Sequence, residues 1–292
     1  MQTAPDTAFE PRKLRLGRGT EMDLGPRSRI MAILNVTPDS FSDGGRYEAT
    51  ETAVAGARAM QREGADIIDI GGESTRPGAE PVSAIEEQRR ILPVIEALSN
   101  DPGLLISVDT WRAETARLAL EAGCHMINDV WGLQREPEIA RIAAREGAAV
   151  AIMHTGRDRE VLADPLEDQF AWFGDSLEIA RRAGLGEDRI LIDPGFGFAK
   201  DADINLELMA RFAELHRFGL PLLAGTSRKR FIGTLTGREA HERDAGTMAT
   251  SVALRLLGAA VFRVHNVAFN KDGLAVADAM VQSSRKGEPD DG

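Results

Sequence analysis

The sequence predicts an α/β fold, specifically a (β/α)8 TIM barrel, from one unit that recurs along the chain. In each copy a helical stretch ends at a glycine, a short apolar run follows, and the run stops at a polar residue, as in EGADIIDIGG and EAGCHMINDV. Glycine just past a helix relieves the left-handed turn there. The runs are too short for helices and lack polar alternation, which is typical of strands buried on both faces of a parallel sheet.

Eight such strands are predicted, beginning at Ile30, Ile67, Leu105, Met126, Ala149, Ile190, Leu222 and Val261. Eight strands with intervening helices in about 250 residues favour the barrel, and a doubly wound open sheet is the alternative. Helices are expected over residues 83–98, 112–121, 168–183, 206–218 and 244–257. The first is the clearest, because Ser83-Ala84-Ile85-Glu86 forms a capping box.

Residues 13–283 are expected to form a single domain. The alternating run Lys13-Leu14-Arg15-Leu16 suggests a short N-terminal hairpin over residues 13–23 that closes the bottom of the barrel. Residues 1–12 and 284–292 are polar and rich in proline and charge, so we expect disordered tails there.

The composition excludes several classes of protein. With 35 Lys+Arg against 46 Asp+Glu, the formal net charge is −11, which argues against nucleic-acid and membrane-surface binding. The single Cys124 excludes an internal disulfide framework and favours the reducing cytosol. No apolar run reaches the length of about 18 residues that a membrane span needs, and no signal peptide is recognisable. We therefore expect a cytoplasmic protein.

Polar residues end nearly every predicted strand, which is where barrel enzymes carry their active sites. They are Asn35, Asp69 with Glu73, Asp109, Asn128 with Asp129, His154, Asp193, Thr226 with Ser227, and Arg263 with His265. Any one of them alone is explained as a cap or turn residue. Together they predict a polar well at the C-terminal end of the barrel.

Asp109, Asn128 and Asp193 would point hydrogen-bond acceptors into this well. No inward basic residue is expected beside them, so a ligand with a row of N–H donors, such as a pterin or guanine edge, would satisfy them. A metal site is the alternative, which the nearby Lys229 disfavours. The basic runs TSRKR (226–230) and RVH (263–265) follow the strands where barrels commonly bind phosphate.

Two loops are long and rich in glycine and proline. They cover residues 35–45 and 71–78, after the first and second strands. Such loops combine limited motion with exposed reactive groups, so we expect them to carry part of the site.

The motifs NVTPDSFSDGG, GGESTRPGA, DPGFGFAK, TSRKRFIG and RVHN, in this order and spacing, resemble the dihydropteroate synthase family from about Lys13 to about Gln282. The resemblance implies condensation of 6-hydroxymethyl-7,8-dihydropterin pyrophosphate with p-aminobenzoate, an EC 2.5.1.15 reaction of folate synthesis. It also implies a dissociative substitution at the pterin methylene, a Mg²⁺ cofactor, inhibition by sulfonamides and a homodimer built on late helices.

The resemblance implies a role for each matching residue. The pterin would be held by Asp109, Asn128, Met153, Asp193, Phe198, Lys229 and Arg263. Pyrophosphate and p-aminobenzoate would contact Phe41, Thr75, Arg76, Pro77, Ser227, Arg228, Arg263 and His265. Asn35 would position Mg²⁺. Catalysis would rest on Asp43, Asp193 and Lys229, with Asp43 stabilising the developing cation or receiving the arylamine proton.

Two positions depart from the family pattern. Asn266 stands where RVHD is usual, so we expect a weakened helix cap or altered anion affinity. Ala199 replaces a glycine, which implies that this position does not require a positive φ.

Two other functions fit the fold. One is a pterin-binding methyltransferase acting between methyltetrahydrofolate and a corrinoid protein, which the STRP, SRK and RVH motifs disfavour. The other is a non-catalytic barrel that binds pterin, which would be expected to have lost Asn35, Asp43, Thr75 or Lys229, and all four are present.

Overall fold

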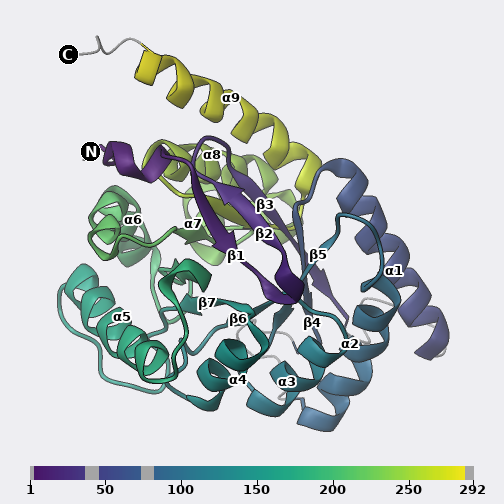
Figure 1. Cartoon of the computed structure of the whole chain (residues 1–292). Coiled ribbons are helices and arrows are strands. Elements are labelled where there is room, and N and C mark those ends of the chain that lie inside the picture. Colours follow the sequence, from purple (N-terminus) through teal and green to yellow (C-terminus); the bar gives the residue numbers. More distant parts are fainter. Residues whose placement is uncertain (1–2, 37–45, 74–81, 287–292) are drawn as a thin grey trace.

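The computed structural model describes residues 3–36, 46–73 and 82–286, and within them eight parallel strands form a barrel (Figure 1). The strands are β3 (Arg29–Asn35), β4 (Ile67–Gly71), β5 (Leu105–Asp109), β6 (Met126–Asp129), β7 (Ala149–Met153), β8 (Ile190–Asp193), β9 (Leu223–Ala224) and β10 (Val261–Val264). They pair in the order β8-β7-β6-β5-β4-β3-β10-β9, and a bridge between Ile192 and Leu222 joins the two edges. The predicted (β/α)8 barrel is confirmed.

Helices surround the strands (Figure 1). They are α1 (Arg46–Glu63), α2 (Ala84–Leu98), α3 (Ala113–Glu121), α4 (Glu138–Glu146), α5 (Pro165–Arg182), α6 (Ala202–Ala210), α7 (Arg230–Thr236), α8 (Asp244–Leu256) and α9 (Val267–Lys286). At the start of α2, Ser83 Oγ accepts from the backbone N–H of Glu86 at 3.2 Å, as the sequence predicts.

Two predicted helices have different limits in the structure. The helix expected over 168–183 starts at Pro165, because Asp164 accepts from the backbone N–H of Leu166 and proline is favoured in the first turn. The helix expected over 206–218 is two elements. Helix α6 is capped by Asp201 and ends at Ala210, and a 3-10 helix covers Phe212–Phe218.

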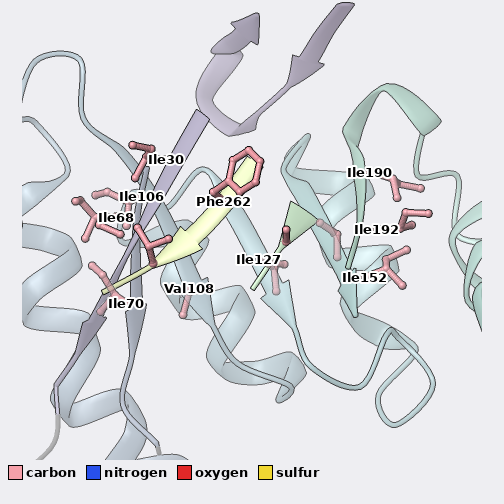
Figure 2. Packing of buried hydrophobic residues seen from close by; sticks show 14 of the residues in the cluster. Ile30, Ile68, Ile70, Ile106, Val108, Ile127, Ile152, Ile190, Ile192 and Phe262 are labelled. Atoms are coloured by element: carbon pink, nitrogen blue, oxygen red, sulfur yellow. The ribbon is translucent and has the colours of Figure 1, made fainter. Parts of the chain in front are cut away.

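Strand side chains alternate between two environments, as the pleat of a strand requires. Outward side chains pack against the helices in one large buried cluster, part of which Figure 2 shows. Inward side chains near the strand starts form a second apolar cluster that includes Met31, Ile67, Met126, Leu191 and Val261. This lower layer of the barrel interior is entirely apolar, and the polar residues lie further along the same strands.

A hairpin covers the N-terminal end of the barrel, as predicted. It consists of β1 (Arg12–Arg15) and β2 (Glu21–Leu24), which pair antiparallel. Its buried side chains pack with the lower layer of the barrel; they are Leu14, Leu16, Met22 and Leu24. The backbone N–H of Gly17 donates to the carbonyl of His125 at 2.8 Å, which ties the hairpin to the barrel.

The terminal segments differ from the disordered tails that were expected. Within residues 1–12, a 3-10 helix covers Asp6–Phe9, and Phe9 is buried beside Val281 because its apolar ring gains a partner on α9. Helix α9 runs to Lys286, beyond the expected domain end at 283. Within the described ranges, no helix combines the length and apolar character needed to cross a membrane.

Candidate active site

A cavity of about 1020 Å³ opens at the C-terminal end of the barrel. This is a volume typical of small-molecule sites. Residues from several strands and from the loops after β8 and β9 line it; among them are Asn35, Asp109, Phe198, Ser227, Arg228, Lys229, Arg263 and His265. The cavity therefore collects most of the described residues that the sequence assigned to a site.

Strand alternation explains why these residues point inward. Asn128 lies two residues after the inward Met126, Asp193 two after Leu191, and Arg263 two after Val261; Asp109 lies four after Leu105. Residues an even number apart on a strand share a face. These polar residues thus form a layer of the barrel interior that lies directly above the apolar layer covered by the hairpin.

Arg263 joins two carboxylates inside the barrel. Its Nε donates to Asp69 Oδ2 and its Nη2 donates to Asp109 Oδ2, each at 2.6 Å. The strands of Asp109, Asn128 and Asp193 carry no inward basic residue, as expected, but a basic side chain reaches Asp109 from β10. The physical reason is reach, since a long arginine side chain on β10 spans the barrel to strands that are not its neighbours.

Asp69 is a site residue that sequence reasoning noted at a strand end but did not assign. It is fully buried, and its Oδ2 also accepts from Asn128 Nδ2 at 3.0 Å. The sequence does mark Asp69 as unusual, because it is a charged residue between two isoleucines in a buried strand.

Burial raises the pKa of Asp109, which lines the cavity, and of Asp193, which is not among the lining residues. The pKa of Asp109 rises to about 7, because burial outweighs the opposing effect of Arg263. The pKa of Asp193 rises to about 6 for the same reason, although the backbone N–H of Gly195 donates to its Oδ1 at 2.7 Å. A buried carboxylate needs hydrogen-bond donors, so a ligand that donates hydrogen bonds is favoured.

Lys229 and Phe198 also line the cavity. The ammonium Nζ lies 4.0 Å from the centroid of the Phe198 ring, a cation–π geometry. Burial, together with the nearby charge of Arg263, lowers the pKa of Lys229 to about 8. Met153 packs with Phe198 and Val130 in a small apolar cluster. The Arg157 guanidinium also lies over the Phe198 ring, at 4.7 Å from its centroid, so this wall combines an aromatic ring with two cations.

The basic segment after β9 faces the same cavity. Ser227 Oγ lies 2.9 Å from His265 Nδ1 and accepts from the backbone N–H of His265 at 3.1 Å. Arg228 lines the cavity, but its Nε and Nη2 donate to Asp244 at 2.7 and 2.9 Å. Ser227 and His265 thus form one hydrogen-bonded unit, and Arg228 keeps only its remaining N–H groups for a ligand.

Both departures from the family pattern have a structural outcome. Asn266 Oδ1 accepts from the backbone N–H of Phe269 at 3.1 Å, so Asn266 caps α9; a weaker cap than an aspartate would form stays a prediction. Ala199 has φ +52°, so the inference that this position avoids positive φ is wrong. The turn after β8 requires that conformation, and Lys200 Nζ stabilises it by donating to the carbonyls of Gly195 and Phe198.

Five residues assigned from the sequence lie outside the described residues. They are Phe41, Asp43, Thr75, Arg76 and Pro77.

Comparison with known proteins agrees with this geometry. Residues 31–265 match the family model described as pterin binding enzyme. The dihydropteroate synthase of Synechocystis sp. is 43% identical over 279 residues, which cover 93% of this chain and 96% of that protein.

Two solved structures are similar along nearly their whole length. The dihydropteroate synthase of Clostridium difficile, solved in the presence of pteroic acid, has a TM-score of 0.86 at 43% identity, covering 89% of this chain and 98% of that one. The Yersinia pestis dihydropteroate synthase in a sulfonamide drug complex has a TM-score of 0.83 at 39% identity, covering 93% and 98%.

The fold and the site define a pterin-binding barrel enzyme. More narrowly, the chain belongs to the dihydropteroate synthase family. It is an alkyl-transferring enzyme of the EC 2.5.1.15 type, which condenses 6-hydroxymethyl-7,8-dihydropterin pyrophosphate with p-aminobenzoate in folate synthesis.

Proposed function

We propose that this synthase holds the pterin between Asp109, Asn128, Asp193 and Lys229 and reacts by dissociative substitution at the pterin methylene. The observation that carries the proposal is the pair of buried carboxyls whose pKa values burial raises to about 7 and about 6. Buried acceptors of this kind match the N–H edge of a pterin. Phe198 and Met153 supply the apolar wall for its ring.

The carboxylates also suit the charge that develops during the reaction. As the bond from the methylene carbon to the pyrophosphate oxygen breaks, positive charge spreads into the electron-rich reduced ring. Asp109 and Asp193 stabilise that charge more strongly in the transition state than in the neutral ground state. The arylamine nitrogen then bonds to the methylene carbon and loses a proton, for which the family resemblance offers Asp43.

The leaving group would lie against the basic end of the cavity. Arg263, Ser227 and His265 line it and carry the donors that a pyrophosphate needs. Arg228 would contribute the N–H groups that Asp244 does not use. Thr75 and Arg76 would act on the pyrophosphate or the aryl acid, and Phe41 and Pro77 would line the p-aminobenzoate pocket.

The residues present fit a Mg²⁺ ion that arrives with the substrate. Among the described residues, no three His, Cys, Asp or Glu side chains gather into a metal site. Mg²⁺ usually keeps several waters and binds through few protein oxygens together with substrate phosphates. Asn35, at the end of β3 and in the cavity lining, would supply such an oxygen. When bound, the ion stabilises negative charge on the leaving group.

A homodimer is proposed through the outer face of α9. Phe269, Val276 and Met280 are 41%, 61% and 52% exposed, and their spacing places them on one side of the helix. Light scattering should give twice the chain mass, and Val276→Glu should reduce it towards one chain. The enzyme is also proposed to be cytoplasmic, in keeping with its buried, unpaired Cys124.

Sulfonamides are proposed to compete with p-aminobenzoate, as the Yersinia pestis complex suggests. A titration of sulfamethoxazole at several p-aminobenzoate concentrations should raise the apparent KM without changing kcat. A fall in kcat at saturating p-aminobenzoate would contradict competition.

The direct test of the site is pyrophosphate release with each component omitted in turn. We expect release only with the pterin pyrophosphate, p-aminobenzoate and Mg²⁺ together, and a fall of about a hundredfold or more in Lys229→Ala. The matched control is Lys13→Ala, since Lys13 lies on the hairpin, paired with Glu21. Undiminished release by Lys229→Ala would remove Lys229 from the site, and pterin binding without turnover would favour a non-catalytic barrel.

A further inference from the structure

We propose that Asp69 is a positioning residue that fixes the direction of the Asn128 amide, and thereby decides which hydrogen-bonding edge of a ligand the site accepts. The inference rests on the proposed role of Asn128 in holding the pterin. Asp69 itself is fully buried, and its side-chain contacts in the described structure are with Asn128 and Arg263, so it acts through these neighbours.

The contacts of Asp69 leave the Asn128 amide one orientation. Asp69 Oδ2 accepts from Asn128 Nδ2 at 3.0 Å and from Arg263 Nε at 2.6 Å. The guanidinium Nε and the amide Nδ2 both donate to the same oxygen, Oδ2, so this oxygen is the acceptor in both contacts. The amide nitrogen of Asn128 is therefore the end that faces Asp69, whichever way an isolated amide would turn.

This orientation decides whether Asn128 offers a hydrogen-bond donor or an acceptor to a ligand in the cavity. With its nitrogen committed to Asp69, Asn128 can offer a ligand only the acceptor Oδ1. Asp109 and Asp193 are acceptors as well, so the chamber favours a ligand edge made of N–H donors. A pterin carries a 2-amino group on that edge, whereas a lumazine carries a 2-oxo group, which would oppose one acceptor with another.

The surroundings of Asp69 also permit a clean test. Asp69 Oδ1 and the hydroxyl of Ser107 are buried, and neither has a hydrogen-bond partner within the described part of the chain. The two residues are paired in the β4–β5 register. An asparagine in place of Asp69 could keep its amide oxygen towards Arg263 and turn its amide nitrogen either towards Ser107 or towards Asn128. Ser107→Ala is the matched control, because it changes the same buried layer without touching Asn128.

The experiment measures binding of 6-hydroxymethylpterin and 6-hydroxymethyllumazine by calorimetry. Wild type and Ser107→Ala should prefer the pterin by about tenfold or more, the discrimination expected when buried polar groups are mismatched. Asp69→Asn should lose most of that preference, because the Asn128 amide can then turn. The double variant Asp69→Asn with Asn128→Asp should regain it, because the new carboxylate at position 128 again presents only acceptors to the ligand.

Two results overturn the inference: a folded Asp69→Asn protein that keeps the wild-type preference, or a folded double variant that does not regain it. If Asp69→Asn alone does not fold, the double variant decides, since it restores the donor–acceptor pair between the two positions. Pterin binding that survives Asn128→Ala would instead refute the pterin site proposed for Asn128. The remaining outcome is that Asp69→Asn keeps the preference for the pterin over the lumazine while Asn128→Ala abolishes it. That result would refute the positioning role of Asp69 and leave the pterin site intact.

Discussion

The amide nitrogen of Asn266 donates to Asp244 Oδ2 at 2.9 Å, while the amide oxygen of the same side chain caps α9. Asp244 is also held by two N–H groups of Arg228. Asn266 therefore connects the basic segment after β9 to the start of the last helix. An aspartate at this position could cap the helix but could not donate to Asp244.

We therefore expect Asn266→Asp to destabilise the protein while kcat stays unchanged. Two carboxylates would face each other, and a loss of about 1 kcal/mol corresponds to a fall of about 2–4 °C in Tm. Thermal unfolding at low and high salt measures it, and salt should reduce the difference by screening. Asn100→Asp, at an exposed turn, is the control. An equal or higher Tm would show that the donor to Asp244 contributes nothing.

Ala199→Gly should stabilise the fold by about 1 kcal/mol, because relief of the left-handed conformation outweighs the extra freedom of glycine in the unfolded chain. Urea denaturation measures the change. The control is Ala144→Gly inside α4, where glycine should destabilise by about 1 kcal/mol. A destabilised Ala199→Gly variant would mean that its methyl group contributes more than the strain costs.

The activity should fall on the alkaline side as Lys229 loses its proton. Burial lowers the pKa of Lys229 from 10.5 to about 8, so its positive charge is present below that pH and lost above it. A pH profile of kcat/KM for the pterin pyrophosphate should show this limb near pH 8. Lys229→Arg should move the limb upward, because arginine does not titrate in this range.

Lys200 provides the competing explanation for such a limb. Burial also lowers its pKa, to about 7. An alkaline limb that stays in place in an active Lys229→Arg variant would assign the titration to Lys200 or to the substrate.

Removal of Mg²⁺ by a chelator should stop pyrophosphate release and leave pterin binding intact. Asn35→Ala should raise the Mg²⁺ concentration needed for half-maximal turnover, since the ion would lose its protein oxygen. Calorimetry with 6-hydroxymethylpterin in the absence of Mg²⁺ should give the wild-type Kd. Asn100→Ala is the control, and an unchanged Mg²⁺ dependence in Asn35→Ala would exclude the assignment.

Much of this architecture follows from the sequence, because the strands have a strict alternation. Once Met126 is placed inward, Asn128 must be inward as well, and the same holds for Leu191 with Asp193. Ser83 caps the start of α2, as the motif predicts, although the Glu86 side chain accepts from Arg90 Nε at 2.9 Å. These features depend on near neighbours in the chain.

Other features depend on contacts that local sequence does not encode. The reach of Arg263 to Asp69 crosses the barrel, between residues 194 positions apart. The burial of Phe9 needs Val281 from the other end of the chain. In each case the partner is known only after the barrel has formed.

The hairpin at the N-terminal end of the barrel affects the order in which the two substrates can bind. Because its leucines and Met22 pack into the lower layer of the barrel, substrates reach the chamber from the opposite end. A ligand bound on Asp109 and Asp193 lies deeper than one bound near Ser227 at the segment after β9. With the pterin and p-aminobenzoate bound as proposed above, we expect the pterin to enter first and the joined product to leave with its pterin end last, which steady-state kinetics would register as a compulsory-order reaction.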